Sequence, residues 1–258
     1  MNWQTSNDVP VRTVGTAFRV LEVVLSKDGA SLNEVVDELD LAPSTAYNHL
    51  TTLREFGFIV REYNTYYIGL RSRQFGEYAQ MRRELYDIVK EHVTDLADTV
   101  DATAGFSVAE HGRAYPIYRT LKYPVERSFA DRFVFYLHTS AVGKAMLANR
   151  TDDEIAAVVD RWGLPEVTSN SITTEAALWE ELHSVTEQGY AINSEESKEG
   201  LRAIGAAVHG PDGRTWGALS LSGPTYWLVE AEMNRLSSDL IQTTEDIEER
   251  LAEQYTTL

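Results

Sequence analysis

The stretch LAPSTAYNHLTTLREFGFI, residues 41–59, constrains the fold of this chain more than any other part of its sequence. Pro43 suits the first position of a helix, where its missing N–H costs nothing, and Gly57 suits the position just after a helix end. Between them, apolar residues recur at helical spacing along one side: Ala46, Leu50 and Leu53. The stretch therefore predicts a helix that ends at about Gly57 and buries one face against neighbouring elements.

Two further helices are expected before this one, and a β-hairpin after it. Apolar residues repeat at helical spacing over residues 14–25. Ser31 and Glu34 have the spacing of a capping box, which predicts the start of a second helix. After the third helix, the runs FIVREYN and YYIGL are rich in β-branched and aromatic residues and flank a turn predicted at residues 64–65. Three helices followed by a hairpin predict a winged helix-turn-helix.

The side of the third helix that faces away from its apolar residues is polar, and residues 44–54 contain no carboxylate. At 100° per residue, the flanks hold Tyr47 and His49, and the outward positions are Ser44, Thr45, Asn48, Thr51, Thr52 and Glu55. Such groups hydrogen-bond base edges and phosphates in a DNA groove, and Asn48 suits a bidentate contact with adenine. Three arginines in or after the wing are candidates for phosphate contacts. The predicted DNA-binding residues are Ser44, Thr45, Tyr47, Asn48, His49, Thr51, Arg61, Arg71 and Arg73.

Two other interpretations of this segment stay open at the level of sequence. Three helices and a hairpin can serve as a protein-interaction module, and short polar residues can simply form a solvated helix face. The chain has 40 Asp and Glu residues against 23 Lys and Arg, a formal charge of −17, so a solvated face would be expected to carry carboxylates. Residues 1–80 have a net charge of only −3, and the remaining residues have −14. This distribution favours DNA as the partner of the N-terminal segment.

The acidity has two physical explanations, avoidance of nucleic acid and adaptation to high salt, in which a dense acidic surface stays hydrated. Arginine outnumbers lysine 18 to 5, which together with the acidity is typical of a haloarchaeal composition. We therefore expect a halophilic protein. The sequence has no cysteine, no apolar run of about 18 residues and no signal-peptide pattern at its start, so we expect a cytoplasmic protein without a membrane span.

The rest of the chain predicts a linker helix and a sensor-like second domain. Helical spacing continues from Arg71 to about Val100, with a break near Met81. A hairpin, three helices, three strands with a Pro-Asp-Gly turn, and a final helix from about Leu228 to Tyr255 follow. This order predicts an α+β fold with an antiparallel sheet. The expected divisions are a DNA-binding domain at 1–72, the linker helix and start of the next domain at 73–100, and the sensor-like domain at 101–258.

No pattern in the sequence predicts catalysis. The segment AVGKAM resembles a phosphate-binding loop but lacks the glycine five residues before Gly143 and the Ser or Thr after Lys144. The six histidines have no metal-ligand spacing. We expect His138 to be a structural hydrogen-bonding group, Lys144 to be a surface charge or an ion-pair partner, and the acidic run SEESKEG to be solvated. Neither an enzyme nor a bound cofactor or metal is predicted.

With these motifs in place, the chain resembles the IclR family of transcriptional regulators over about residues 12–255. The segment STAYNHLTTLREFGFI matches the family's helix-turn-helix, and YYIGL resembles its Tyr-x-Leu-Gly element. LHTSAVGKAMLA is similar to its His-Ala-x-x-x-Gly-Lys-Ala segment, and GYAINSEESKEGLRAIGAAVHGPDGRTWGALSLSGP is similar to its C-terminal signature. The resemblance implies a winged helix-turn-helix joined by a linker helix to a GAF-like effector-binding domain. It also implies homodimers or homotetramers that bind palindromic double-stranded DNA operators.

The resemblance further implies a pocket for a small-molecule effector, such as a sugar acid or another carboxylate. The matching positions are Ala141, Val142, Asn193, Ala203, Ser220 and Ser222, with Phe135, Leu201 and Leu219 as expected apolar walls. Two departures bear on the ligand: Asn193 stands where an acidic residue is common, and Ala203 where cysteine is common. An Asn side chain can donate and accept hydrogen bonds without repelling an anion. The alternative function is a small-molecule-binding module or enzyme that uses its winged helix for protein contacts.

Overall fold

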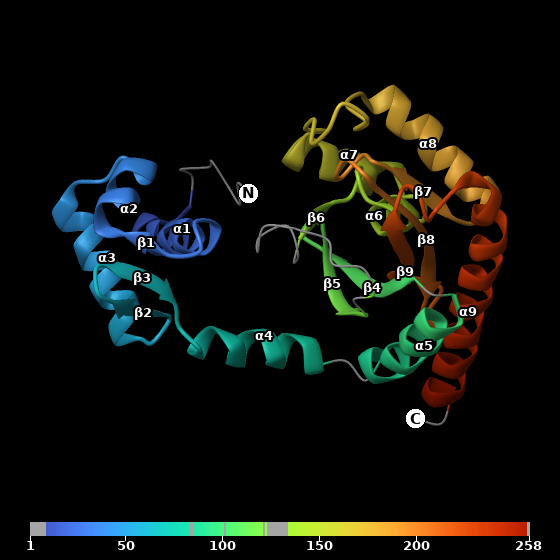
Figure 1. Cartoon of the computed structure of the whole chain (residues 1–258), viewed down its shortest axis with the longest axis horizontal. Coiled ribbons are helices and arrows are strands. Elements are labelled where there is room, and N and C mark those ends of the chain that lie inside the picture. Colours follow the sequence, from blue (N-terminus) through green and yellow to red (C-terminus); the bar gives the residue numbers. More distant parts are fainter. Residues whose placement is uncertain (1–8, 83–84, 101, 121, 123–133, 257–258) are drawn as a thin grey trace. The chain divides into compact units, whose positions relative to one another are not determined.

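The computed structural model describes residues 9–82, 85–100, 102–120, 122 and 134–256 (Figure 1). The described residues divide into two compact units, residues 9–82 and the described residues from 85 to 256. The break falls inside the segment in which the sequence predicts an interrupted linker helix. Within the described residues, no helix is both long enough and apolar enough to cross a membrane.

The first unit is a winged helix-turn-helix followed by one further helix. Its elements are α1 (Arg12–Ser26), β1 (Ala30–Ser31), α2 (Leu32–Leu39), α3 (Pro43–Glu55), β2 (Ile59–Glu62), β3 (Thr65–Ile68) and α4 (Arg71–Met81). The strands form an antiparallel sheet in the order β1-β3-β2. The core is fully buried at Val20, Val35, Leu50 and Ile59, so α1, α2, α3 and the hairpin contribute to one apolar cluster. The predicted order of three helices and a hairpin is confirmed.

Local signals set the helix ends in this unit. The Ser31 hydroxyl accepts the backbone N–H of Glu34, whose carboxylate accepts the backbone N–H of Ser31 at 2.8 Å, which completes the capping box at the start of α2. Gly57 follows the end of α3 and has a φ of +74°. A residue with a side chain adopts this left-handed conformation only at a cost in free energy. The wing turn lies at residues 63–64, one residue earlier than predicted, because Glu62 pairs with Thr65.

The second unit is an antiparallel sheet with helices on both faces. Its helices are α5 (Leu85–Val100), α6 (Ala141–Leu147), α7 (Asp152–Trp162), α8 (Glu175–Gln188) and α9 (Glu230–Thr256). Its strands are β4 (Thr103–Glu110), β5 (Arg113–Arg119), β6 (Phe135–Tyr136), β7 (Ala191–Ser194), β8 (Leu201–His209) and β9 (Thr215–Pro224). The strand order is β6-β5-β4-β9-β8-β7, and every pair is antiparallel. The predicted α+β fold with an antiparallel sheet is confirmed.

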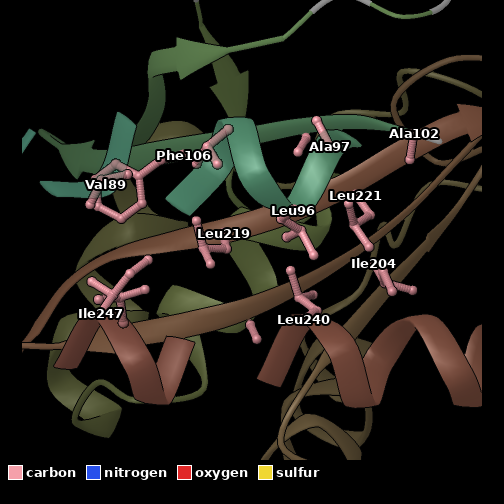
Figure 2. Packing of buried hydrophobic residues seen from close by; sticks show 14 of the residues in the cluster. Val89, Leu96, Ala97, Ala102, Phe106, Ile204, Leu219, Leu221, Leu240 and Ile247 are labelled. Carbon is pink, nitrogen blue, oxygen red and sulfur yellow. The ribbon is translucent and has the colours of Figure 1, made fainter. Parts of the chain in front are cut away.

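The two faces of this sheet differ in what covers them. On one face, α5 and α9 pack against large apolar side chains of the strands (Figure 2). The labelled members of this cluster include Leu96, Phe106, Ile204, Leu219, Leu221 and Leu240. Leu219 is therefore wrong as an expected wall of the effector pocket, because it alternates with Ser220 and points into this core. The opposite face carries small residues and is covered by α6, against which α8 packs.

Candidate nucleic-acid interface and effector site

The third helix exposes the polar side that the sequence predicts. Ala46 and Leu50 are fully buried and hold α3 against the rest of the unit. Ser44, Thr45, Tyr47 and Asn48 are exposed, and His49 and Thr51 are half-buried. Throughout residues 9–82, no hydrogen bond engages the side chain of any of these six residues. Their donors and acceptors are therefore available to a partner, which is what a helix that reads base edges requires.

Arg61 braces the turn of the wing. Its Nε donates to the backbone carbonyl of Tyr63 at 2.9 Å, and its Nη2 donates to Oδ1 of Asn64 at 3.3 Å. The guanidinium also lies 5.5 Å from the centre of the Tyr66 ring. Arg61 is exposed, so a phosphate contact is compatible with this geometry, but such a contact would compete with the hydrogen bonds that hold the turn.

The two arginines after the wing have internal partners as well. Arg71 donates from Nη1 to the backbone carbonyl of Phe56, the residue after α3, and lies over the ring of Phe58. Arg73 forms an ion pair with Glu77 one helical turn further along α4, at 2.6 Å. Arg71 thus satisfies a free carbonyl at the end of the candidate reading helix. Phosphate contacts by these residues stay predictions.

Tyr63 at the wing turn was not singled out by the sequence reasoning. Its side chain is 98% exposed, and its φ of +55° places it in the left-handed region at the first position of the two-residue turn. At the tip of the wing, this ring is accessible to a partner of the first unit. The sequence alone carried no signal for it, because the register of β2 and β3, in which Glu62 pairs with Thr65, decides that Tyr63 lies in the turn.

On the small-residue face, the strands β7, β8, β9 and β4 form two neighbouring rows that contain expected effector-site residues. The first row contains Asn193, Ala203, Ser222 and Thr103, which are consecutive register partners on β7, β8, β9 and β4. The second row contains Ala191, Gly205, Ser220 and Gly105 on the same strands. Ser220 and Ser222 therefore share one face, as predicted, and both are partly exposed. Leu201 lies two residues before Ala203 on β8, which places it on this face as well.

The start of α6 lies over these two rows of residues. A Cβ added to Gly205 would come within 2.8 Å of the backbone of Ala141 and Val142, so the glycine permits the close approach of α6 to β8. A Cβ on Gly143 would meet the backbone of Leu137, so this glycine permits close packing at the start of α6. Phe135 on β6 packs against the apolar cluster that contains Val142. The structure thus places every expected effector-site residue except Leu219 on this side of the sheet.

The amide of Asn193 has local partners. Its Oδ1 accepts the backbone N–H of Glu196 at 2.9 Å, and its Nδ2 donates to Oγ of Ser197 at 2.7 Å. One N–H and one lone pair of the amide have no part in these bonds. Asn193 is therefore a structural residue of the turn after β7 that retains limited capacity to contact a ligand.

A buried ion pair ties this turn to α6. Lys144 is 1% exposed, and its Nζ lies 2.7 Å from Oε1 of Glu196 and 2.8 Å from Oε1 of Glu181. Burial raises the pKa of Glu196 even though Lys144 opposes this shift. Lys144 is thus an ion-pair partner, one of its two expected roles. The expectation that the run SEESKEG is solvated is wrong for Glu196, because an ion pair with a residue 52 positions away compensates its burial.

The remaining polar groups near this face are structural. His138 is 4% exposed, and its Nε2 lies 3.1 Å from the backbone carbonyl of Pro165. Burial lowers the pKa of His138, so the neutral ring donates from Nε2 to that carbonyl. This matches its expected structural role. The described residues include no group of three or more His, Asp or Glu side chains placed to hold a metal ion.

A winged helix-turn-helix on one unit and a ligand-binding type of α+β domain on the other define the class of effector-responsive DNA-binding regulators. The comparisons with known proteins agree with this class. Residues 13–62 match the IclR helix-turn-helix domain, and residues 78–249 match the C-terminal domain of the bacterial transcriptional regulator IclR. The chain therefore belongs to the IclR family of transcriptional regulators. This membership confirms the expectation of a regulator rather than an enzyme.

Individual relatives span nearly the whole chain. The "Probable HTH-type transcriptional regulator ArcR" of Halobacterium salinarum is 30% identical over 230 residues, which cover 86% of each chain. The crystal structure of the Thermotoga maritima IclR matches with a TM-score of 0.70 and 24% identity over 93% of this chain and 98% of that one. An IclR homologue from Microbacterium hydrocarbonoxydans, solved with 4-hydroxybenzoate, matches with a TM-score of 0.74 and 20% identity over 93% and 98%.

Proposed function

We propose that this regulator binds a palindromic operator as a homodimer or homotetramer, and that a small carboxylate, such as a sugar acid, controls the binding. The observation that carries the proposal is the exposed polar side of α3, whose hydrogen-bonding side chains have no partner among residues 9–82. Ser44, Thr45 and Asn48 would contact base edges and phosphates from this helix. Tyr47, His49 and Thr51 would extend the contact surface on either side.

Exposed apolar side chains in the first unit support association of two copies. On α1 and the residue before it, Val11, Val14 and Phe18 are 59%, 52% and 62% exposed at helical spacing. On α4, Tyr78 and Met81 are 75% and 80% exposed. Apolar surface of this extent is stabilised when a second copy covers it. A two-fold symmetric pair of reading helices would in turn match a palindromic site.

The acidity of the chain fits operation in a salty cytoplasm. Counterion release contributes less to DNA binding as the salt concentration rises, so phosphate attraction is weak in molar salt for any protein. Binding would then depend on short-range contacts to base edges, which the uncharged side of α3 supplies. The 30% identical relative from Halobacterium salinarum supports the halophilic assignment.

A carboxylate effector suits the small-residue face of the second unit. The hydroxyl groups of Ser220 and Ser222 offer donors, and Asn193 presents a neutral amide in place of an acidic residue. The Microbacterium hydrocarbonoxydans homologue was solved with 4-hydroxybenzoate, which is also a small carboxylate. Effector binding would change the fit of paired reading helices to successive major grooves.

An operator shift assay at several salt concentrations tests the DNA-binding role. The full-length protein, mixed with the promoter region of its own gene, should bind above its level on random DNA of equal length. The Asn48→Ala variant should lose about 1–3 kcal/mol of binding free energy on the operator and little on random DNA, because a base-edge contact is sequence-specific. The matched control is Asn170→Ala, which removes an exposed amide from the second unit.

Two outcomes would contradict this role. Equal losses on operator and random DNA would show that Asn48 does not read bases. Failure of the wild-type protein to distinguish any tested promoter from random DNA would favour the alternative, in which the winged helix serves protein contacts.

A further inference from the structure

A small cavity lies where two neighbouring strands of the second unit stop pairing. The ladder between β4 and β9 ends at the pair Ser107–Ala218. Beyond this pair, β4 continues to Glu110 and β9 reaches back to Thr215, and these two described segments do not pair with each other. A cavity of about 150 Å³ is lined from both strand ends. Ser220 lies about 15 Å further along β9, so the cavity is separate from the rows of expected effector-site residues.

The walls of this cavity come from both sides of the sheet. Tyr86 on α5 belongs to the apolar cluster of one face, and Met146 on α6 belongs to that of the other. Trp216 also lines the cavity, and its indole N–H donates to Oδ1 of Asp212 at 3.0 Å. The two aromatic side chains are therefore held in place by contacts within the protein. A cavity of this volume suits a ligand of about five to ten non-hydrogen atoms, since drug-sized molecules occupy pockets of roughly 300 Å³ or more.

The cation of this cavity is Arg150, three residues after the end of α6. Arg150 is half-buried, and its guanidinium forms no hydrogen bond or ion pair with any residue that the structure describes. Hydrogen bonds from Thr151 lower the pKa of Glu154, and the charge of Arg150 adds to this effect from a distance. The donors of the guanidinium are therefore open to a ligand.

The lining supplies two further polar groups. Oγ1 of Thr215 is buried and has no hydrogen-bond partner among the described residues. Glu110 also lines the cavity and already has a contact within the protein, but a carboxylate accepts several hydrogen bonds and keeps its charge. A guanidinium presents two parallel N–H groups that match a carboxylate, and a hydroxyl adds a further donor. A carboxylate and aromatic rings attract an ammonium group.

The two charges of the lining balance, so an anion or a cation alone would leave one of them without a counter-charge. We propose that the cavity is a second ligand site, which binds a small zwitterion, namely a free amino acid with a short side chain or its N-methylated form. Arg150 binds the carboxylate of the ligand, and Glu110 binds its ammonium group together with the rings of Tyr86 and Trp216. Charges in a partly enclosed cavity are screened by salt less than charges on the surface, so the site is suited to high salt.

Titration calorimetry and thermal shift on the full-length protein, at pH 6.5 in molar salt, test this site with three ligands of similar size. They are glycine, acetate, which lacks the ammonium group, and glycinamide, which lacks the carboxylate. An α-amino group with a pKa of about 8 is protonated at this pH. The wild-type protein should bind glycine about tenfold more tightly than either acetate or glycinamide.

Two further comparisons define the ligand class. L-Alanine and N,N,N-trimethylglycine distinguish a free amino acid from an N-methylated one, and the tighter binder identifies which form the cavity takes. L-Tryptophan carries the same charged groups on a side chain too large for the cavity, so it should not bind.

Substitutions of the two charged residues test their separate roles. Arg150→Gln should weaken glycine binding about tenfold to a hundredfold and remove the preference for glycine over glycinamide. Arg150→Lys should keep part of the affinity, since it retains the charge without the fork. Glu110→Gln should remove the preference for glycine over acetate. The matched control is Arg214→Gln, because Arg214 is an exposed arginine next to Thr215 that does not line the cavity, and this variant should bind glycine as the wild-type protein does.

Three results would overturn the proposal: no zwitterion binds the wild-type protein, acetate or glycinamide binds as tightly as glycine, or Arg150→Gln binds glycine no more weakly than Arg214→Gln. Circular dichroism of each variant separates loss of fold from loss of binding, and Arg150→Lys serves as the milder variant. Arg150→Gln should bind the operator without ligand as tightly as the wild-type protein. If the protein binds zwitterions through Arg150 but binds no operator, the DNA-binding proposal fails and the second ligand site stands.

Discussion

At the scale of single residues, the buried charge of Lys144 has the largest expected effect on stability. Replacing it by Met would leave the carboxylate of Glu196 buried at 7% exposure without its nearest cation. We expect Lys144→Met to lower the free energy of unfolding by about 3–5 kcal/mol, because an uncompensated buried charge costs far more than a lost surface pair. Denaturant unfolding in molar salt measures this loss.

The double variant Lys144→Met, Glu196→Gln provides the control for that prediction. Removing both charges should recover a large part of the stability, since the buried carboxylate is then gone and only the partly exposed Glu181, whose side chain is 30% exposed, loses its cation. If the single and double variants lose the same stability, the ion pair is not the cause of the loss.

His209 predicts a pH dependence of stability. Its Nδ1 lies 2.9 Å from Oε1 of Glu248, and its Nε2 lies 3.1 Å from Oδ1 of Asn149. Asn149 donates from Nδ2 to the carbonyl of Ala145, which orients its oxygen toward the ring. Both ring nitrogens therefore face acceptors, and only the protonated imidazolium can donate to both. The hydrogen bond to Glu248 raises the pKa of His209, and this outweighs the opposing effect of burial.

The sign of the effect follows from that raised pKa. Protonated His209 stabilises the fold fully below its unfolded pKa near 6.5, and the stabilisation is lost as the pH rises through the higher pKa of the folded state. The melting temperature of the wild-type protein should therefore fall between pH 6 and pH 9 by more than that of Glu248→Gln, in which the ion pair is absent. Identical pH profiles for the two proteins would exclude this role of His209.

At the scale of elements, the end of α3 depends on a residue from outside the helix. Arg71 at the start of α4 donates to the carbonyl of Phe56 and lies over the ring of Phe58. We expect Arg71→Gln to lower the free energy of unfolding by about 1 kcal/mol, because a charge-assisted hydrogen bond is lost at an exposed position. Arg73→Gln, which removes an exposed ion pair with Glu77, should change stability less.

Salt dependence of DNA binding separates the two roles of Arg71. If Arg71 only braces α3, the variant should bind operator and random DNA more weakly with the same slope of affinity against salt. If it contacts a phosphate, that slope should fall by about one. Thermal unfolding and shift assays at four or more salt concentrations distinguish these cases.

At the scale of the whole molecule, the exposed side of α1 predicts self-association. Phe18 is 62% exposed, and Val14 one turn earlier is 52% exposed. We expect Phe18→Glu to shift the protein toward monomers and to reduce operator binding, since a charge at an apolar interface is costly to bury. Sedimentation analysis over a range of concentrations in molar salt measures the shift.

Tyr226→Ser is the control for this substitution, because Tyr226 is 78% exposed in the second unit. The Tyr226→Ser variant should self-associate to the same extent as the wild-type protein. An unaltered oligomeric state in Phe18→Glu would place the interface elsewhere and would remove α1 from the proposed assembly.

Much of the element order is predictable from local sequence, since local interactions decide it. The capping box of Ser31 and Glu34, Pro43 at the start of α3, and Gly57 after its end each act within a few residues. The apolar spacing of Ala46, Leu50 and Leu53 then determines which side of α3 is exposed. The break after Met81 was also visible from spacing. The sequence therefore predicts correctly which polar residues of α3 are exposed.

The sequence by itself thus determined the elements, the family and the outward side of α3, because each depends on residues that are neighbours along the chain. Only the tertiary structure decided which distant groups meet. Lys144 with Glu196, Arg71 with Phe56, and Arg119 with Gly105 are pairs that no periodic pattern predicts. The position of Leu219 shows the same limit, since the packing of α5 and α9 makes its side of β9 the core. Long-range contacts depend on strand register and helix packing, which the whole chain sets together.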